Sequence, residues 1–454
     1  MTKRNFTILI MLLLIITIVY FGFMYFRKST TPLVPGESNN FWSTFNPFNK
    51  NNANPNYATP PGNTDNIPTT GNDTPGKLKK VSSMPVAGYG VFLKERLKEI
   101  PPVVPAVPAE ASTPVATTTA IPSTTKPVAV TPTTPPTEFA TALRYVDRAS
   151  GNIFQTFADN IEERKFTTTT IPVIYEALFG NQAQSVVMRY LKSDDRTIAT
   201  FVGNLPKEYL GADTLEDSQV KGIFLPDNVT EVSISPDTFK IFYLVNSGNN
   251  VLGSTFNFLD NKKTQVFNSA FTEWLPMWAN GGLITMTTKP SWDVLGYMYD
   301  INLLKGNSFN KTLGGVNGLT TLASPSGNLT LYTDNSLVLN VYHQDSGATM
   351  QLGVRTLPEK CVWGGANNLV YCAVPKTLGA GIYPDNWYQG EESFNDQLWK
   401  INIETGVTTL LLDPFSTPLA GEEIDGIKLS LDNGENYLFF VNKKDSYLWR
   451  LDLR

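Results

Sequence analysis

Hydrophobic and polar residues alternate in short segments through the last two-thirds of the chain, a period typical of half-buried β-strands. A larger pattern repeats: an apolar strand, a turn of small residues, and further strands that end in an aromatic-rich hairpin. The clearest copies occupy residues 229–246, 318–335 and 425–453. Each copy holds four strands at a period of roughly forty to fifty residues, which is typical of stacked repeats. The pattern therefore predicts an all-β fold, a β-propeller.

The repeats can be counted along the chain, and seven fit it, with six as the alternative. The first repeat is expected from strands at residues 86–95, 143–148, 152–158 and 164–171, and the next five at residues 172–228, 229–270, 271–314, 315–357 and 358–414. Residues 423–454 supply three strands of the last repeat. Residues 77–83 have the pattern of a spare outer strand, so we expect this N-terminal strand to close the ring beside residues 447–453. Closure pairs sheet edges that would otherwise promote aggregation.

Two stretches of biased composition interrupt the strand pattern. Residues 29–76 are rich in Asn, Pro and Thr with few charges, so they cannot bury enough apolar surface to offset ordering entropy, and we expect a flexible tether. Residues 101–137 are about half Pro and Thr, which is typical of extended, polyproline-like chain. Because strand patterns flank this stretch on both sides, we interpret it as an insertion within the first repeat. The propeller domain then comprises residues 77–454.

The N-terminal segment has a pattern of its own. Residues 6–26 form a run of 21 without charge, which as a helix spans roughly 31 Å, the hydrocarbon thickness of a bilayer. Two basic residues precede the run and two follow it. A cleaved signal peptide is the alternative, but its apolar region is shorter and ends at a small-residue cleavage site, which is missing here. We expect residues 1–28 to be an uncleaved transmembrane anchor that crosses the membrane once.

Three features indicate the side of the membrane, since the equal basic flanks decide nothing. The tail before the anchor is too short for a domain, the tether is typical of an extracytoplasmic spacer, and the two cysteines are placed as a disulfide requires. Cys361 and Cys372 flank a GGANN turn, and directly opposed residues of an antiparallel pair lie within disulfide reach. Buried free thiols are the alternative, and a register shift of one residue would exclude the bridge. Because disulfides persist in oxidising compartments, we expect the C-terminal domain to be extracytoplasmic, held at the cell membrane.

Composition excludes several functions. A formal net charge of −5 is unlike that of a nucleic-acid-binding protein, which needs a basic face. One histidine and two cysteines are too few for a typical zinc site, so we expect no metal and no cofactor. The histidine, His343, stands alone in a predicted strand, where such a residue is usually structural. Because the sequence holds no G-x-S-x-G motif and no evident catalytic constellation, we expect a protein that is not an enzyme.

The longest loop within a repeat joins the second and third strands of the sixth. It interleaves aromatic and acidic side chains, and we predict a binding site formed by Tyr383, Asp385, Trp387, Tyr388, Glu391, Glu392 and Phe394. Such a set suits a sugar, a peptide or a basic protein surface. The alternative is a loop that packs its own aromatic rings over the mouth of the propeller. A second acidic loop, residues 206–222, is expected to be solvated.

Short motifs carry a resemblance to known families. The SPD and SPSG turns at residues 235–237 and 324–327, each followed by an apolar strand, resemble the repeats of TolB-like, WD-type propellers, which implies a periplasmic location and protein contacts in the envelope. Residues 430–437 fit the S-x-D-x-G-x-x-aromatic turn of sialidases, which is structural in that family. The stretches KLKKVSSMPVAG, ALRYVDRASGNI, KCVW…VYCAVP and DNWYQG…SFNDQLWKI are similar to membrane-anchored propellers of candidate-phylum bacteria. That likeness implies a fold and no activity.

Taken together, these patterns predict a membrane-anchored, extracytoplasmic propeller that serves as a protein–protein interaction or scaffolding module of the bacterial cell envelope. Its expected partners are the membrane, through residues 6–26, and an envelope protein or a glycan. A lectin-like, glycan-binding propeller that uses Trp387 and its neighbours is the alternative. A glycosidase fits less well, because it needs carboxylates that converge in the channel, and sequence alone does not place them.

Overall fold

The structure is a computed structural model, and it describes residues 77–98, 136–208, 210, 218–416 and 422–454. Residues Pro68–Arg454 form a compact unit. Residues 1–76, which hold the predicted membrane anchor and the tether, lie outside the described residues, as does nearly all of the Pro/Thr-rich insertion. In the described part of the chain, no helix is long and apolar enough to span a bilayer.

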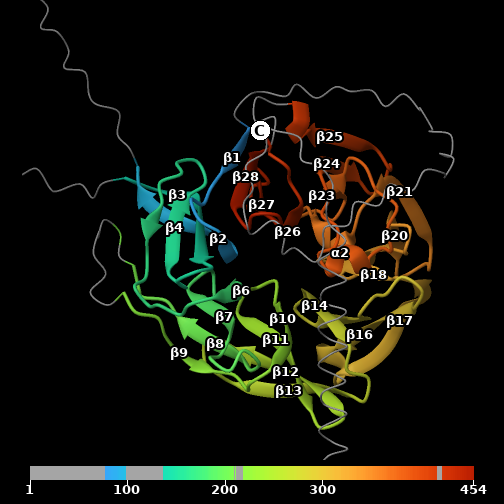
Figure 1. Cartoon of the computed structure of the whole chain (residues 1–454), viewed down its shortest axis with the longest axis horizontal. Coiled ribbons are helices and arrows are strands. Elements are labelled where there is room, and N and C mark those ends of the chain that lie inside the picture. The colour runs from blue at the N-terminus through green and yellow to red at the C-terminus, as the bar shows by residue number, and fades with distance from the viewer. Residues whose placement is uncertain (1–76, 99–135, 209, 211–217, 417–421) are drawn as a thin grey trace, which may run out of the picture. The chain divides into compact units, whose positions relative to one another are not determined.

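The described residues form seven four-stranded antiparallel sheets, which follow one another around a ring (Figure 1). Four consecutive strands form each of the first six sheets, which we number as blades one to six. Blade one holds β2 (Val86–Leu97), β3 (Thr137–Asp147), β4 (Ile153–Phe157) and β5 (Arg164–Lys165). Blade two holds β6 (Ile174–Gly180), β7 (Ser185–Leu191), β8 (Ile198–Asn204) and β9 (Lys221–Phe224). Blade three holds β10 (Val229–Ile234), β11 (Lys240–Ser247), β12 (Asn250–Asn257) and β13 (Lys263–Ser269).

The next three blades follow the same order. Blade four holds β14 (Trp274–Asn280), β15 (Leu283–Thr288), β16 (Leu295–Asn302) and β17 (Ser308–Asn317). Blade five holds β18 (Thr320–Ala323), β19 (Leu329–Thr333), β20 (Val338–His343) and β21 (Thr349–Arg355). Blade six holds β22 (Cys361–Trp363), β23 (Leu369–Pro375), β24 (Asp396–Asn402) and β25 (Thr408–Leu412). Short helical turns lie between strands at η2 (Leu303–Lys305), η3 (Pro358–Lys360), α2 (Asp385–Tyr388) and η4 (Pro414–Ser416).

Blade seven combines strands from both ends of the described chain. It holds β26 (Gly426–Leu431), β27 (Tyr437–Asn442), β28 (Leu448–Asp452) and, at its edge, β1 (Leu78–Lys80). In the register of β1 and β28, Leu78 lies opposite Leu451, and the Val81 amide donates to the Leu448 carbonyl at 2.7 Å. The prediction of an all-β, seven-bladed propeller is confirmed, and the six-bladed alternative is excluded.

Buried apolar side chains gather where neighbouring blades meet. Each of the seven neighbouring pairs, including blades seven and one, shares such a cluster. Between blades seven and one, Phe439 and Leu448 pack with Leu143 and Tyr145. Every residue of β27 is buried, because blades cover both faces of a middle strand. The middle strands therefore have continuous apolar runs instead of alternating patterns.

The motifs that carried the family resemblance are hairpin turns between the first and second strands of a blade. Ser235 Oγ accepts a hydrogen bond from the Lys240 amide at 3.0 Å, and Asp237 Oδ1 accepts one from the Phe239 amide at 3.0 Å. The sialidase-like turn is held in the same way, since Asp432 Oδ1 accepts from the Tyr437 amide at 2.7 Å. Side-chain acceptors of this kind favour turns over regular structure. These motifs therefore act as structural turns in this fold.

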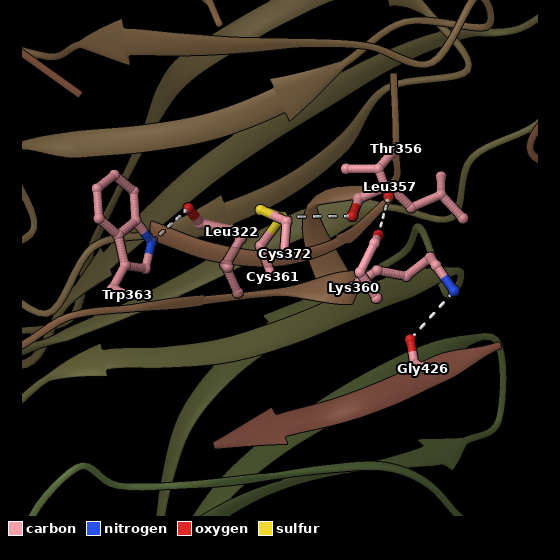
Figure 2. The surroundings of a disulfide bond; sticks show 9 residues. Leu322, Thr356, Leu357, Lys360, Cys361, Trp363, Cys372 and Gly426 are labelled. Atoms are coloured by element: carbon pink, nitrogen blue, oxygen red, sulfur yellow. Dashed lines mark hydrogen bonds between the residues drawn. A yellow bond between two sulfur atoms is a disulfide. The ribbon is translucent and has the colours of Figure 1, made fainter. Parts of the chain in front are cut away.

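The predicted disulfide is confirmed. Cys361 lies directly opposite Cys372 in the β22–β23 pair, and their Cα atoms are 4.1 Å apart. Figure 2 shows the bridge flanked by Trp363, whose Nε1 donates to the Leu322 carbonyl at 3.3 Å, and by Lys360. Both cysteines are buried in the cluster between blades five and six. The bridge thus crosslinks the two innermost strands of blade six.

Candidate functional site

The blade-six loop, residues 376–395, contains all seven residues of the predicted binding site. Its aromatic rings Tyr383, Trp387 and Phe394 are buried, with exposures of 4%, 5% and 3%. Trp387 and Phe394 stack on each other, with ring centroids 6.1 Å apart. These three rings form a cluster of their own with Leu337 and Leu357, so their faces are not free for a sugar. The geometry matches the alternative in which the loop packs its own aromatic rings.

The other four predicted residues divide between structural contacts and solvent. Asp385 accepts hydrogen bonds from Ser291 Oγ at 2.9 Å and from the Trp292 amide at 2.6 Å, which ties the loop to blade four. Glu392 accepts from the Tyr383 hydroxyl at 2.6 Å. Glu391 is exposed, and Tyr388 is the exposed ring of the predicted set, at 39%.

A buried ionic cluster lies under the blade-six loop and was not foreseen from the sequence. Lys360, Asp396 and Asp425 all have side chains with 0% exposure. Lys360 Nζ lies 2.8 Å from Asp396 Oδ2 and also pairs with Asp425. Asp425 in turn accepts from Trp387 Nε1 at 3.0 Å and from the Phe394 amide at 3.1 Å. The cluster therefore fastens the aromatic rings of the loop to blades six and seven.

The carboxyl groups of this region titrate differently because their surroundings differ. Burial raises the pKa of Asp396 to about 6, against the opposing charge of Lys360. Burial also acts on Asp425, but the charge of Lys360 and its hydrogen bonds outweigh it and lower the pKa. Burial raises the pKa of Glu359 to about 7. The Tyr388 hydroxyl donates to Glu359, while Glu359 Oε1 has no hydrogen-bond partner among the described residues.

A concave basic pocket lies elsewhere, between blades one and two. Its volume is about 570 Å³, and its walls come from β2, the ends of β3, β4 and β5, the β6–β7 turn and the start of the β8–β9 loop. Since the β6–β7 turn joins first and second strands, the pocket lies at the end of the blades opposite the blade-six loop. Five cations line it, namely Lys94, Arg96, Arg144, Arg164 and Lys207, against two carboxylates, Glu95 and Glu208. This pocket is therefore a candidate anion-binding site.

Arg144 is the most deeply placed of the pocket cations. It is 4% exposed, and it donates to the Ala183 carbonyl at 2.6 Å and to Gln155 Oε1 at 2.9 Å. Its guanidinium lies 4.0 Å from the centroid of the Phe166 ring. Burial lowers its pKa to about 10, so it stays charged at neutral pH. These contacts hold the guanidinium in a fixed place before any ligand arrives, which reduces the entropy cost of binding.

Glu208 is a carboxylate at the centre of three pocket cations. Lys94 Nζ lies 2.5 Å from Glu208 Oε1, Arg144 Nη2 lies 3.3 Å from Oε2, and Arg164 also donates to Oε1. Burial alone would raise the pKa of Glu208, but hydrogen bonding to Lys94 and the three positive charges lower it. The expectation that residues 206–222 form a solvated loop is therefore wrong for Glu208. A sequence signal existed: Lys94 and Arg96 lie two apart on β2, where side chains share a face.

Three comparisons relate the chain to known proteins. No family model matches it, and no curated protein matches it. Among solved structures, an oligogalacturonate lyase in complex with manganese is 10% identical, with a TM-score of 0.48, covering 69% of this chain and 85% of that one. An oligogalacturonate lyase from Vibrio parahaemolyticus is 9% identical, with a TM-score of 0.44, covering 69% of this chain and 86% of that one. A puromycin-hydrolysing peptidase from Mycobacterium tuberculosis is 11% identical, with a TM-score of 0.42, covering 67% of this chain and 48% of that one.

These likenesses correct one expectation and leave two as predictions. The expectation that the chain is not an enzyme is wrong, because the similar solved structures are two lyases and a peptidase. At 9–11% identity the likeness concerns the fold alone and assigns no reaction to this chain. No family model and no curated protein supports the resemblance to TolB-like and candidate-phylum propellers, so it stays a prediction.

Proposed function

We propose that this chain is an interaction propeller that binds an anionic group in the basic pocket between blades one and two. The observation that carries the proposal is the arrangement of Lys94, Arg144 and Arg164 around a single carboxylate in a concave pocket of about 570 Å³. Ligand pockets typically have volumes of this order and hold a few fixed polar groups. Five cations and two carboxylates line the pocket, and Arg96 also pairs with Glu138 and Asp159 outside that lining, so one positive charge remains in excess and favours an anion although the whole chain carries a net charge of −5.

The proposal includes a place in the cell. We place the propeller outside the cytoplasm, tethered to the cell membrane by residues 6–26, as a module of the bacterial cell envelope that meets an envelope protein. The uncharged run of 21 residues and the Cys361–Cys372 bridge support this placement. Mass analysis of the native protein without reductant should find the two cysteines joined, and alkylation of both thiols would count against the placement.

The basic pocket fits a ligand better than the blade-six loop does. Three of the four aromatic rings predicted in that loop are buried, and two of its acidic residues serve internal hydrogen bonds. A lectin-like role would have to use Tyr388, the exposed ring of the predicted set. The pocket instead offers charged donors that are already oriented, and hydrogen bonds to charged groups are the stronger ones.

The test measures binding of anionic probes to the full-length chain. Polyglutamate, polygalacturonate and pyrophosphate would be titrated at low ionic strength, because salt screens such contacts. The double variant Lys94→Gln/Arg164→Gln should weaken binding at least about tenfold, since each lost charged hydrogen bond costs about 1.5–3 kcal/mol. The matched control, Lys263→Gln/Lys305→Gln, removes two exposed lysines of blades three and four and should bind like the wild type. Absence of saturable binding to every probe, or equal affinity of the two double variants, would refute the proposal.

A further inference from the structure

The side-chain carboxylate of Glu208 contacts the neighbouring strands. Its side chain pairs with Lys94, Arg144 and Arg164 and also accepts from Gln155 Nε2 at 3.4 Å. Among the described residues, none of the backbone groups of residues 206–208 makes a backbone hydrogen bond. The last such anchor before it is the Leu205 amide, which donates to the Gln184 carbonyl at 2.8 Å. The segment is thus a short piece of chain that places one glutamate side chain in a basic pocket.

The three cations do not depend equally on Glu208. Arg144 keeps its hydrogen bonds to Ala183 and Gln155 and its position over Phe166 without that carboxylate. Lys94 lies 5.5 Å from the centroid of the Phe157 ring, and Arg164 is 38% exposed. If the carboxylate left, three positive charges would face the pocket without a counter-charge of their own. Another carboxylate could then take the same place.

The walls around this position indicate the kind of molecule that brings the carboxylate. Leu210 lines the pocket and is 48% exposed, whereas Leu93 and Leu97 lie on the face of β2 opposite Lys94. Covering an exposed leucine side chain is favourable by about 25 cal/mol per Å² of apolar surface. A peptide with an apolar residue beside an acidic one can cover Leu210, whereas a sugar acid or a phosphate offers little apolar surface. Glu208 itself shows that a glutamate carried on a peptide backbone fits among the cations.

We propose that Glu208 is an internal occupant of the site, and that the partner's ligand is an acidic peptide segment, flanked by apolar residues, whose carboxylate displaces it. This inference rests on the proposed function and adds the ligand class and a built-in competition. The exchange replaces one set of ion pairs by an equivalent set, so the internal carboxylate weakens binding of the partner. Removing the Glu208 charge should therefore strengthen binding.

The experiment uses the full-length chain and a fluorescein-labelled peptide of alternating leucine and glutamate, followed by fluorescence anisotropy. Glu208→Gln should bind this peptide roughly tenfold tighter than the wild type, because the competing charged contacts are lost. Glu208→Asp keeps the charge on a shorter side chain and should lie between the two. The matched control, Glu404→Gln, changes an exposed glutamate in the β24–β25 loop of blade six and should bind like the wild type. A peptide with glutamine in place of glutamate should not bind.

Each outcome has a separate meaning. If the wild type binds the peptide and Glu208→Gln, shown by its melting curve to be folded, binds no tighter, the internal competition is refuted. If Glu208→Gln does not fold, equal affinity of Glu208→Asp and the wild type refutes it instead. If Glu208→Gln gains affinity for polygalacturonate or inorganic phosphate but not for the peptide, the peptide class is wrong. If neither protein binds any anionic probe, the proposed function itself fails.

Discussion

Replacing Lys360 by methionine tests whether the buried ionic cluster holds the blade-six loop. The change leaves Asp396 and Asp425, both with 0% exposure, without their cation. Removing one partner of a buried ion pair typically costs about 3–5 kcal/mol, because the remaining charge is buried without compensation. We expect the free energy of unfolding of Lys360→Met, measured by denaturant titration at pH 7.5, to fall by that amount.

The pH dependence of this loss follows from the carboxyl groups. In the wild type, the raised pKa of Asp396 means that its contribution to stability is fully present below the unfolded pKa of about 3.9 and declines as pH rises through about 6. Asp425, with its lowered pKa, behaves oppositely: its contribution is present above the unfolded value and is lost as pH falls through the folded one. Without Lys360 both carboxyls bind protons more readily in the folded state. The deficit of the variant should therefore be smaller at pH 5 than at pH 7.5.

A matched control separates burial from charge. Lys376 also pairs with an aspartate, Asp413, at 3.0 Å, but its side chain is 45% exposed. Exposed pairs are worth about 0–1 kcal/mol, so Lys376→Met should barely change the free energy of unfolding. A loss below about 1 kcal/mol for Lys360→Met, or equal losses for the two variants, would refute the reasoning that burial makes the Lys360 cluster costly to break.

Three further predictions concern the ring and the loop. Removing residues 1–76 should leave the free energy of unfolding of the propeller unchanged, whereas removing residues 1–83 should lower it, since β1 pairs with β28; equal stability would contradict closure by this strand. Limited proteolysis between residues 101 and 137 should give two pieces that stay together on gel filtration, because β2 and β3 pair from Val86↔Asp147 to Leu97↔Thr137. Separation of the pieces would contradict the interpretation of this stretch as an insertion within blade one. Because burial raises the pKa of Glu359, its contribution to the stability of the fold is lost as pH rises from about 4.3 through about 7. The free energy of unfolding of Glu359→Gln should therefore fall less over this range than that of the wild type. Parallel pH profiles of the two proteins would contradict the burial of Glu359.

The repeat pattern was sufficient for the architecture because the physics behind it is local. Strand periodicity, turns such as residues 235–237, and the spacing of copies all depend on neighbours in the sequence. The same is true of the disulfide, since the register of a hairpin follows from its turn, and Cys361 does lie opposite Cys372. The Pro/Thr-rich insertion stays a prediction, although β2 ends at Leu97 and β3, predicted at residues 143–148, begins at Thr137.

Sequence alone did not reveal the surroundings of side chains that contact several blades. The loop around Trp387 has the composition of a binding loop. In the structure, however, Trp387 Nε1 and the Phe394 amide donate hydrogen bonds to Asp425, which lies in the connection to blade seven, and the rings are buried. The basic pocket combines residues 94, 144, 164 and 208 from four separate segments, of which the sequence marked only one, through Lys94 and Arg96 on the same face of β2.

The sequence by itself therefore predicted the propeller, with seven blades favoured over six, and the opposed cysteines of its sixth blade, because these depend on local periodicity and hairpin register. The tertiary structure alone decided which charges are buried and which cations converge on one carboxylate. The reason is physical: the pKa of a carboxyl group and the affinity of a cation depend on the few ångströms of protein around them, and in a propeller that protein belongs to neighbouring blades.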